Sequence, residues 1–330
     1  MASTLIDAPR SANGGPDEGG RHLPSLLLAG LGAFLVVLSA MTKLYIEPAL
    51  AVAPIDQDSV TRLHADDATI FDSRVDVLKT ITTDLDVAAH TIGDVSASKK
   101  APGDAVVWNN TTTVRSADGV IRSQTTKRAA FDKRTAAAVN CCGNFMEVQE
   151  GVREPVKRSG LMYKFPFGTD KKTYQVWDDT IAAPVRTTYE RTSKVDGTKV
   201  YVFENDVPAT TVGTREVPAS LLGLTTTGNV TADSFYQNHS TYYVEPVTGA
   251  ILNQVNDTKS WLGYEGHELV TTDAHIAYTS KQTKDLLDEL GTKLTLLKLA
   301  QGFVPWLVTA LGLVLVAGGA TRALRRPRRA

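Results

Sequence analysis

The sequence predicts a mostly β domain, with antiparallel sheets in a chain that is α+β overall, between two single transmembrane α-helices. Three observations support this prediction. Apolar runs without a charged side chain lie near both ends of the 330-residue chain. Between them, short runs rich in Val, Thr and Tyr are separated by turn signals, as is typical of β-strands. A leucine stripe with helical spacing, which indicates an amphipathic helix, directly precedes the second apolar run.

The two apolar runs are long enough to cross a lipid bilayer as helices. We assign the membrane segments to residues 23–43 and 302–320. A helix rises about 1.5 Å per residue, so their uncharged parts each cover roughly 26–29 Å, close to the thickness of the hydrocarbon core. In lipid the backbone must satisfy its own hydrogen bonds, and for an isolated span only a helix does this.

The first run has an alternative interpretation as a cleaved signal peptide. Ala49-Leu50-Ala51 has the small-x-small form of a cleavage site. However, the apolar run is longer than the usual core of a signal peptide, and this site lies well beyond its end. The sequence therefore favours a retained helix.

The basic C-terminal tail predicts the orientation of the chain. Residues 321–330 contain five arginines and no acid, whereas residues 1–22 carry a mixed charge and no apolar period. Arginines that flank a span stay in the cytoplasm, and two spans place both tails on the same side. We therefore expect a cell-membrane protein with cytoplasmic N- and C-termini and an extracytoplasmic domain over residues 44–280.

Turn signals divide the central domain into strands. Asp118-Gly119 separates the apolar-rich runs 106–114 and 120–126, which is a strong signal for a two-residue hairpin. No stretch in this domain keeps a helical apolar period for three turns, so the domain is expected to be mostly antiparallel β. Further strands are expected at residues 198–203, 240–244, 250–256 and 268–278.

The period changes to that of a helix at residues 281–301. Leu286, Leu290, Leu294 and Leu297 share one face of this amphipathic juxtamembrane helix. The leucine face could pack on the β domain, lie on the bilayer or continue into the second span. Packing on the domain is favoured, because a leucine stripe usually belongs to a core.

Composition and motifs point away from several classes of function. The formal net charge of −1 argues against nucleic-acid binding. The sequence contains no G-x-S-x-G elbow and no Walker loop, and His267-Glu268 lacks the second histidine of a zinc-protease motif. We therefore expect no catalytic residues, no metal site and no cofactor, and predict that the protein is not an enzyme.

The chain has only two cysteines, Cys141 and Cys142, and they are adjacent. An exported domain favours oxidation, although adjacent Cα atoms are closer than in most disulfides. A vicinal disulfide that stiffens a turn, two free thiols and a redox site are the alternatives. The structural turn is favoured, because no C-x-x-C motif or helix N-terminus is expected nearby.

One aromatic-rich stretch is a candidate for ligand binding. Residues 161–168 read LMYKFPFG, and two more rings follow shortly afterwards. Such a cluster either lines an apolar cavity or fills a core, and core packing is the more common case. The candidate lining residues are Phe165, Phe167, Tyr174 and Trp177.

Three blocks of sequence resemble a known family. They are residues 130–135 (AFDKRT) leading to 139–143 (VNCCG), residues 164–169 (KFPFGT) leading to Tyr174 and Trp177-Asp178, and residues 243–249 (YVEPVTG). On these blocks the chain resembles the porin-A-like membrane proteins of actinobacteria, formerly a domain of unknown function. The resemblance covers nearly the whole chain, including both apolar runs, but none of the blocks is a catalytic motif.

The resemblance implies a role in the cell envelope. One member of the family, the mycobacterial polar growth factor, is associated with trafficking of trehalose monomycolate and with its inner-membrane exporter. By analogy, the expected partners are membrane lipid, an envelope lipid or glycolipid as ligand, and an inner-membrane exporter. The leading hypothesis is an anchored extracytoplasmic protein that binds or transfers an envelope lipid. The alternatives are a scaffold of envelope growth without a ligand, and a channel formed by oligomerised spans.

Overall fold

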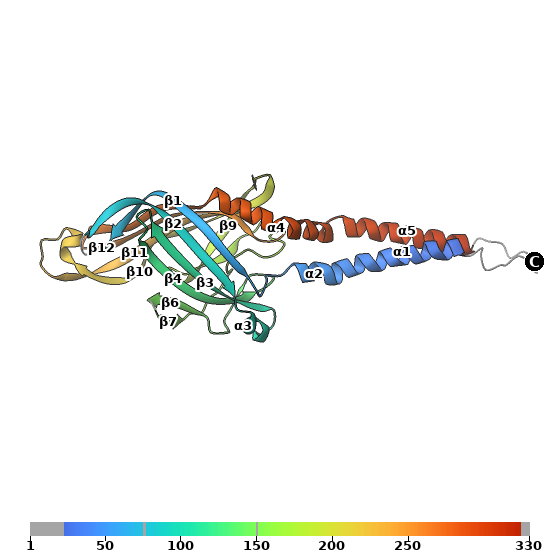
Figure 1. The fold of residues 1–330 in the computed structure, drawn as a ribbon, viewed down its shortest axis with the longest axis horizontal. Coiled ribbons are helices and arrows are strands. Elements are labelled where there is room, and N and C mark those ends of the chain that lie inside the picture. The colour runs from blue at the N-terminus through green and yellow to red at the C-terminus, as the bar shows by residue number, and fades with distance from the viewer. Residues whose placement is uncertain (1–22, 75–76, 150, 325–330) are drawn as a thin grey trace, which may run out of the picture. The chain divides into compact units, whose positions relative to one another are not determined.

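The computed structural model describes residues 23–74, 77–149 and 151–324 (Figure 1). These residues form two compact units. One contains the described residues up to Pro48 together with those from Leu299 onward, and the other extends from Ala49 to Lys298. We refer to them as the helical unit and the β unit.

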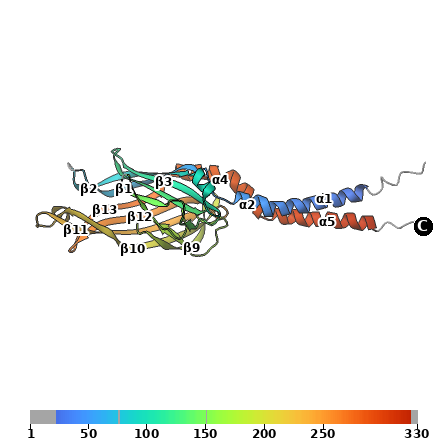
Figure 2. The same ribbon diagram turned by 90° about the horizontal axis from the view of Figure 1, so that it is seen from below.

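The helical unit is an antiparallel pair formed by α1 (Leu23–Met41) and α5 (Val304–Leu324), as Figure 2 shows. A π-helical turn (Thr42–Ile46) and the short α2 (Glu47–Leu50) follow α1. Both apolar helices are long and apolar enough to cross a membrane. Their exposed side chains include Leu26, Phe34, Leu307 and Leu311. An apolar outer surface of this kind suits a lipid environment, in which helices associate through close packing.

Small residues bring α1 and α5 together. A Cβ atom built on Gly312 would lie 2.7 Å from the carbonyl oxygen of Gly32, so only glycine allows this approach. Further along the pair, Thr309 Oγ1 donates to Ser39 Oγ at 2.8 Å, and Ser39 Oγ donates to the carbonyl oxygen of Pro305 at 2.7 Å. These two hydroxyl groups therefore bond within the pair and do not face its surroundings.

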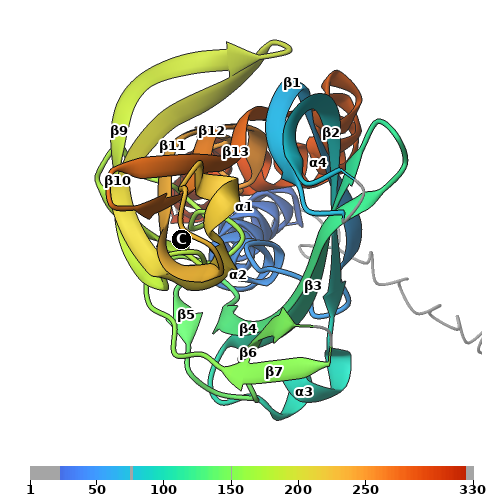
Figure 3. The ribbon, with the colours of Figure 1, turned by 90° about the vertical axis from the view of Figure 1, so that its left-hand side faces the viewer.

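The β unit contains one long, strongly curved antiparallel sheet (Figure 3). Its order is β7-β6-β4-β3-β2-β1-β13-β12-β11-β10-β9-β8, and β5 pairs with β4. The strands are β1 (Asp58–Asp72), β2 (Lys79–Gly93), β3 (Ala105–Ser116), β4 (Ile121–Asp132), β5 (Ala138–Val139), β6 (Phe145–Gln149), β7 (Val152–Pro155), β8 (Tyr174–Asp178), β9 (Ala183–Val195), β10 (Thr198–Pro218), β11 (Asn229–Val244), β12 (Ile251–Tyr264) and β13 (His267–Tyr278). This architecture confirms the predicted fold class.

The sheet closes on itself through a short bridge. Leu161 pairs with Ala137, next to β5, on one side and with Val176 of β8 on the other. Leu161 N donates to the carbonyl oxygen of Gln175 at 2.7 Å, and Met162 N donates to that of Ala136 at 2.8 Å. Because β5 pairs with β4 and β8 pairs with β9, hydrogen bonds run continuously around a ring.

Residues 161–169, which we call the inner segment, fill part of this ring. The Phe165 ring stacks on Phe203 of β10 with 4.7 Å between centroids. The Tyr163 ring lies 5.4 Å from Trp108 of β3, so the segment contacts strands far apart in the sheet. The main core cluster surrounds it and includes Val106, Trp108, Phe131, Met162, Phe165, Phe203 and Tyr242. Burying these large rings is a major favourable term for folding of the unit.

Helix α4 (Ser280–Gln301) packs on the β unit over its residues 280–298. Near its start, Gln282 Oε1 accepts from the backbone N–H of Arg62, and Thr283 Oγ1 donates to the carbonyl oxygen of Leu252. Leu294 and Leu297 are buried. The leucine face of the amphipathic helix therefore packs on the β domain, and this is the arrangement that the sequence favoured.

Turn chemistry explains where the chain reverses. Gly119 has φ +82° in the turn between β3 and β4, and Asp196-Gly197 connects β9 with β10. Some strands are much longer than the runs that indicated them, and β10 continues for 21 residues, whereas β13 nearly matches its expected run 268–278. A short helix, α3 (Val95–Lys100), was not predicted, and it begins where the Asp94 side chain accepts from Ala97 N. This is ordinary N-terminal capping. The helix has only six residues, so its sequence shows no helical apolar period.

Candidate functional site

A cavity of about 510 Å³ lies within the ring, beside the inner segment. Its walls come from β1, β2, β3, β4, β12 and β13, from the turn between β11 and β12, from α4 and from the inner segment. The apolar lining residues include Leu63, Val87, Ala89, Trp108, Phe167, Ile251, Leu286 and Leu290. The polar lining residues include Gln57, Ser59, Thr61, Thr91, Asn110, Thr112, Lys127, Lys164, Gln254, Glu289 and Lys293. The cavity is thus amphipathic, and its volume falls in the range of roughly 300–1,000 Å³ typical of small-molecule sites.

Strand periodicity places these side chains in the cavity. Every second residue from Gln57, which directly precedes β1, to Leu63 lines the cavity, and the same alternation holds for Val87, Ala89 and Thr91 in β2. The intervening residues point to the opposite face of the sheet. His90, for example, pairs there with Asp58, with 2.8 Å between Nε2 and Oδ1.

The aromatic candidates divide between the core and the cavity. Phe167 lines the cavity. Phe165 and Tyr174 belong to the buried core, and Trp177 packs against that core while its Nε1 donates to Asp179 Oδ1 at 2.8 Å. Of the four residues, the structure brings only Phe167 to the cavity wall.

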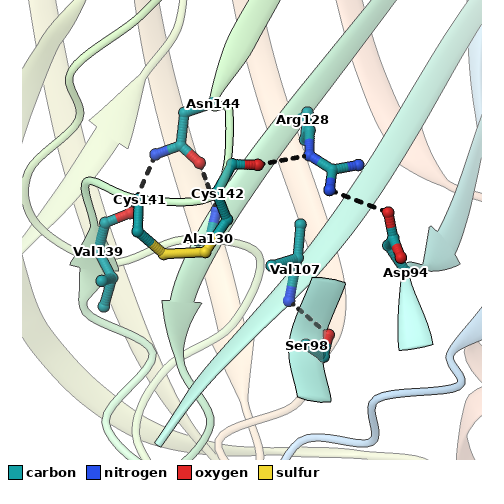
Figure 4. Close-up of a disulfide and its surroundings, with 9 residues drawn as sticks. All are labelled: Asp94, Ser98, Val107, Arg128, Ala130, Val139, Cys141, Cys142 and Asn144. Carbon is teal, nitrogen blue, oxygen red and sulfur yellow. Dashed lines mark hydrogen bonds and ion pairs between the residues drawn. A yellow bond between two sulfur atoms is a disulfide. The ribbon is translucent and has the colours of Figure 1, made fainter. Parts of the chain in front are cut away.

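Cys141 and Cys142 are joined by a disulfide in the structure (Figure 4). Hydrogen bonds hold the turn that contains it. Arg128 Nε donates to the Cys142 carbonyl oxygen at 3.0 Å, and Asn144 Nδ2 donates to the Val139 carbonyl oxygen at 3.0 Å. Neither cysteine lines the cavity. In the structure the two cysteines are therefore bonded to each other within a hydrogen-bonded turn, and the structural role of this turn stays a prediction.

The three sequence blocks that carry the family resemblance meet at the inner segment. Phe167 N donates to the carbonyl oxygen of Arg134, in the first block, at 3.1 Å. Phe165 N donates to that of Gly249, in the third block, at 2.9 Å. The inner segment itself contains most of the second block. The blocks therefore specify one local structure at the base of the cavity, although they are far apart in the sequence.

Lys164 is the central charged group of this structure. Its Nζ donates to the Thr248 carbonyl oxygen at 2.7 Å and lies 3.3 Å from the centroid of the Phe167 ring. Burial lowers the pKa of Lys164 well below its ordinary value, and the nearby charge of Lys293 lowers it further, while Glu245 raises it. Removing an ammonium group from water is costly unless it is paired, which explains the direction of the shift.

A second lysine, Lys293 of α4, approaches the same ring. Its Nζ lies 5.3 Å from the Phe167 centroid and donates to the carbonyl oxygen of Val52 at 3.0 Å. Burial lowers the pKa of Lys293, and Glu289 acts in the opposite direction. Two cationic side chains from distant parts of the chain therefore converge on one aromatic ring in the cavity wall.

The third lysine in the cavity wall has a carboxylate partner, which it shares with a buried arginine. Lys127 Nζ lies 2.6 Å from Asp179 Oδ2, and Asp179 Oδ1 also accepts from Nε of the buried Arg158. Two further Arg158 nitrogens donate to the carbonyl oxygens of Arg128 and Phe145. The charges in this network are paired and hydrogen-bonded, which indicates a structural role.

Hydrogen bonds between neighbouring strands tie the polar wall together. Asn110 Nδ2 donates to Thr91 Oγ1 at 2.9 Å, and Thr112 Oγ1 donates to Asn110 Oδ1 at 3.0 Å. The Tyr163 hydroxyl, by contrast, is enclosed and has no hydrogen-bond partner in the described part of the chain. The described residues also contain no group of three or more His, Cys, Asp or Glu that could hold a metal ion.

Lys164 and Lys293 were not singled out as a pair in the sequence. Lys164 belongs to a stretch selected for its aromatic rings, and Lys293 belongs to an amphipathic helix in which lysines usually face solvent. The available signal was a lysine between apolar residues in LMYKFPFG. A charge flanked by rings in this way indicates either burial or a cation–π contact.

Comparison with known proteins agrees with the resemblance in the motifs. The sequence profile described as Porin PorA matches residues 24–321. A Porin PorA of Corynebacterium amycolatum is 29% identical over 121 residues, covering 29% of this chain and 31% of that protein. A Porin PorA of Corynebacterium resistens is 23% identical over 277 residues, covering 62% of this chain and 67% of that protein. The first match thus spans less than a third of its relative's length.

Two solved structures show weak similarity. A DUF1329 family protein from Desulfovibrio piger is 11% identical, covering 76% of this chain and 91% of its own, with a TM-score of 0.22. An outer-membrane lipoprotein-sorting protein domain from Vibrio parahaemolyticus is 9% identical, covering 71% of this chain and 87% of its own, with a TM-score of 0.19. These TM-scores are too low to show a shared fold.

The profile match extends through α1, the β unit and α5. The two apolar helices and this match together fit a membrane protein. The predicted resemblance is confirmed, and the chain belongs to the Porin PorA family.

Proposed function

We propose that this protein is a membrane-anchored, non-catalytic carrier that binds a lipid of the cell envelope in the cavity of its β unit and passes it to a partner. The amphipathic cavity of about 510 Å³ is the observation that carries the proposal. Its apolar wall suits acyl chains, and its amide, hydroxyl and ammonium groups suit a polar headgroup.

The helical unit supports a site of action at the membrane. Because α1 and α5 are antiparallel, the start of α1 and the end of α5 lie at the same end of the pair. We propose that this end is cytoplasmic, because Arg322 and the arginines that follow it would be retained there. The β unit would then be extracytoplasmic, where it could receive a lipid from an inner-membrane exporter.

A channel is the second candidate function, and the name of the relatives favours it. A water-filled path along the spans would need polar groups on the outside of the helix pair. In the described pair, Ser39 and Thr309 instead bond to each other, so a pore would require several copies of the pair. Single-channel conductance of the purified protein in a planar bilayer would support this candidate over the carrier.

Filling the cavity tests the carrier proposal. Ala89 lines the cavity, and Ala88 precedes it on the opposite face of the same strand. We expect full-length protein purified in mild detergent to retain lipid, as detected by native mass spectrometry and lipid extraction. Ala89→Trp should remove most of this lipid, because the larger side chain occupies the cavity.

Ala88→Trp is the matched control and should retain lipid at the wild-type level. Both variants should keep the far-ultraviolet circular dichroism of the wild type. Absence of lipid from the wild-type protein, together with no uptake from added lipid, would overturn the proposal and favour a scaffold role. Equal retention by the two variants would show that the lipid binds elsewhere.

A further inference from the structure

We propose that Lys164 and Lys293 form a binding site for the anionic group, a phosphate or a carboxylate, of a lipid held in the cavity. The inference rests on the proposed lipid-binding function and specifies the chemical class of the ligand. It concerns one part of the cavity, where the inner segment, α4 and the turn between β11 and β12 meet.

Neither ammonium group has a carboxylate partner. Among the described residues, Lys164 Nζ and Lys293 Nζ form no ion pair, and each donates one hydrogen bond to a backbone carbonyl, of Thr248 and Val52 respectively. A lysine ammonium has three donors. Two donors on each side chain are therefore unused by the described protein, and both side chains line the cavity.

Lys127 provides an internal comparison. It lines the same cavity, but its Nζ lies 2.6 Å from Asp179 Oδ2. The chain therefore supplies a counter-ion for one cavity lysine and none for the other two. Since burying an unpaired charge is unfavourable, retention of two such lysines is readily explained by a counter-ion that the ligand supplies.

Both ammonium groups lie near the Phe167 ring. Lys164 Nζ lies 3.3 Å and Lys293 Nζ 5.3 Å from its centroid. A cation–π contact stabilises an ammonium group modestly, but a ring cannot neutralise two positive charges. An anionic oxygen group between the ammonium groups would relieve their repulsion and accept charge-assisted hydrogen bonds.

The nearby acids do not substitute for such a ligand. Glu245 is buried, and its Oε2 accepts from the backbone N–H and the hydroxyl of Thr248, at 2.8 and 2.7 Å. Glu289 also lines the cavity, but it is exposed on α4 and forms no ion pair with either lysine. Both raise the pKa of a neighbouring lysine, yet the pKa of Lys164 and that of Lys293 remain below their ordinary values because burial has the larger effect.

The rest of the cavity accounts for the remainder of the ligand. Leu286 and Leu290, one turn apart on α4, line the cavity near Lys293, and Trp108 and Tyr278 contribute rings from the sheet. An anionic group bound at the two lysines therefore leaves apolar wall available for an acyl chain. This combination favours an anionic amphiphile over a free inorganic anion.

The experiment compares lipids with and without an anionic headgroup. Full-length protein stripped of lipid in a neutral detergent is titrated with phosphatidylglycerol or with diacylglycerol bearing the same acyl chains, and bound lipid is counted by native mass spectrometry. We expect the wild type to prefer phosphatidylglycerol by about tenfold, which corresponds to a single charge-assisted hydrogen bond. Inorganic phosphate at the same concentration should not compete, because it lacks the acyl chains.

Substitutions identify the residues. The double variant Lys164→Gln/Lys293→Gln should bind both lipids equally, with phosphatidylglycerol affinity reduced about tenfold. The matched control is Lys171→Gln/Lys281→Gln, which removes the same charge from two exposed lysines outside the cavity and should keep the preference. Single Gln variants show which lysine contributes more if the double variant does not fold.

The outcomes separate this inference from the proposed function. Binding of both lipids without preference by the wild type would overturn the anion site and leave the carrier function standing. Preference that persists in folded Lys164 and Lys293 variants would also overturn it. Binding of neither lipid would contradict both proposals, and competition by inorganic phosphate would show a site for a free anion.

The preference should also depend on pH. The phosphodiester stays charged, whereas the pKa of Lys164 and that of Lys293 are lowered by burial, with Glu245 and Glu289 opposing the shift. Anion binding requires the protonated lysines and therefore takes up protons. Affinity for phosphatidylglycerol should fall as pH rises and the lysines lose their protons, while diacylglycerol binding stays constant. A pH-independent preference would contradict the assignment to these lysines.

Discussion

At the scale of single residues, Gly249 shows how one backbone position supports the cavity wall. It lies in the turn between β11 and β12, has φ +71°, and its carbonyl oxygen accepts from Phe165 N. A Cβ atom at this position would lie 2.1 Å from the Phe165 carbonyl oxygen and 2.4 Å from that of Pro166. The turn and the inner segment therefore approach so closely that no side chain fits between them.

We predict that Gly249→Ala destabilises the β unit and loosens the inner segment. A non-glycine residue in the left-handed region costs roughly 1–2 kcal/mol, and the backbone clash adds to this. Gly266→Ala is the matched control, since Gly266 has φ +84° in the turn after β12 with no atom within 4 Å of its Cβ position. Thermal unfolding of the full-length variants, followed by circular dichroism, should show a clearly larger fall in Tm for Gly249→Ala. Equal falls would mean that the close contact does not contribute.

Residue-level inference from the sequence succeeded where local chemistry decides the outcome. The stretch LMYKFPFG was recognisable as special from its rings, and Phe167 does line the cavity. Phe165 and Tyr174 instead pack against Phe203 in the core. No local sequence pattern reveals this long-range contact. The convergence of Lys164 and Lys293 was equally inaccessible, because only the packing of α4 on the sheet brings them together.

At the scale of elements, α1 and α5 illustrate pairing without a hydrophobic driving force. Leu and Val side chains gain little by leaving lipid, so close backbone packing and hydrogen bonds must provide the association. Ser25, Gly32 and Ser39, spaced by seven residues, are the buried positions of α1. The sequence also has small residues at a spacing of four, at Ser25, Ala29 and Ala33, but Ala33 is exposed because the contact follows the seven-residue stripe.

We predict that Gly312→Val separates α1 from α5. The new side chain would meet the Gly32 carbonyl oxygen and the Val36 side chain within 3 Å. Gly30→Val is the control, because Gly30 has open space around its Cβ position. Both are placed in a Ser39→Cys/Thr309→Cys chain that lacks Cys141 and Cys142. The disulfide between residues 39 and 309 should form several-fold more slowly in the Gly312 variant, as followed by gel mobility after proteolysis between the helices. An unchanged rate would show that the pair tolerates the side chain.

Element-level inference depended on how clearly each segment shows its period. The apolar helices and α4 were predictable, because their patterns extend over four turns or more. The strand pair β3–β4 was predictable from its two-residue turn. Strands β1 and β2 gave little signal, since both of their faces carry polar groups. Ser59, Thr61 and Thr91 line the cavity, and His64, Asp86 and His90 lie on the other face. Strands that line a polar cavity on one face and meet solvent on the other therefore lack the alternation of apolar and polar residues by which a strand is recognised in a sequence.

At the scale of the whole molecule, the chain combines a sheet that closes on itself with a separate pair of apolar helices. Pairing of β1 with β13 joins the first and last strands of the sheet region, and Leu161 closes the ring between β5 and β8. These contacts are long-range in sequence, so ring closure could not be predicted from local patterns. Its consequence is a cavity whose wall comes from strands far apart in the sequence.

The topology proposal makes a prediction for the intact molecule. In a chain with Cys141 and Cys142 replaced by serine, Ala117→Cys places a single thiol on an exposed residue of the β unit, and Ser11→Cys places one before α1. A membrane-impermeant maleimide applied to intact cells should label residue 117 and leave residue 11 unlabelled until the membrane is opened. The physical reason is that the arginines after α5 are retained in the cytoplasm, and the antiparallel pair keeps the start of α1 on the same side. Labelling of residue 11 with protection of residue 117 would invert the orientation. It would place the cavity in the cytoplasm, where it could not receive an exported lipid.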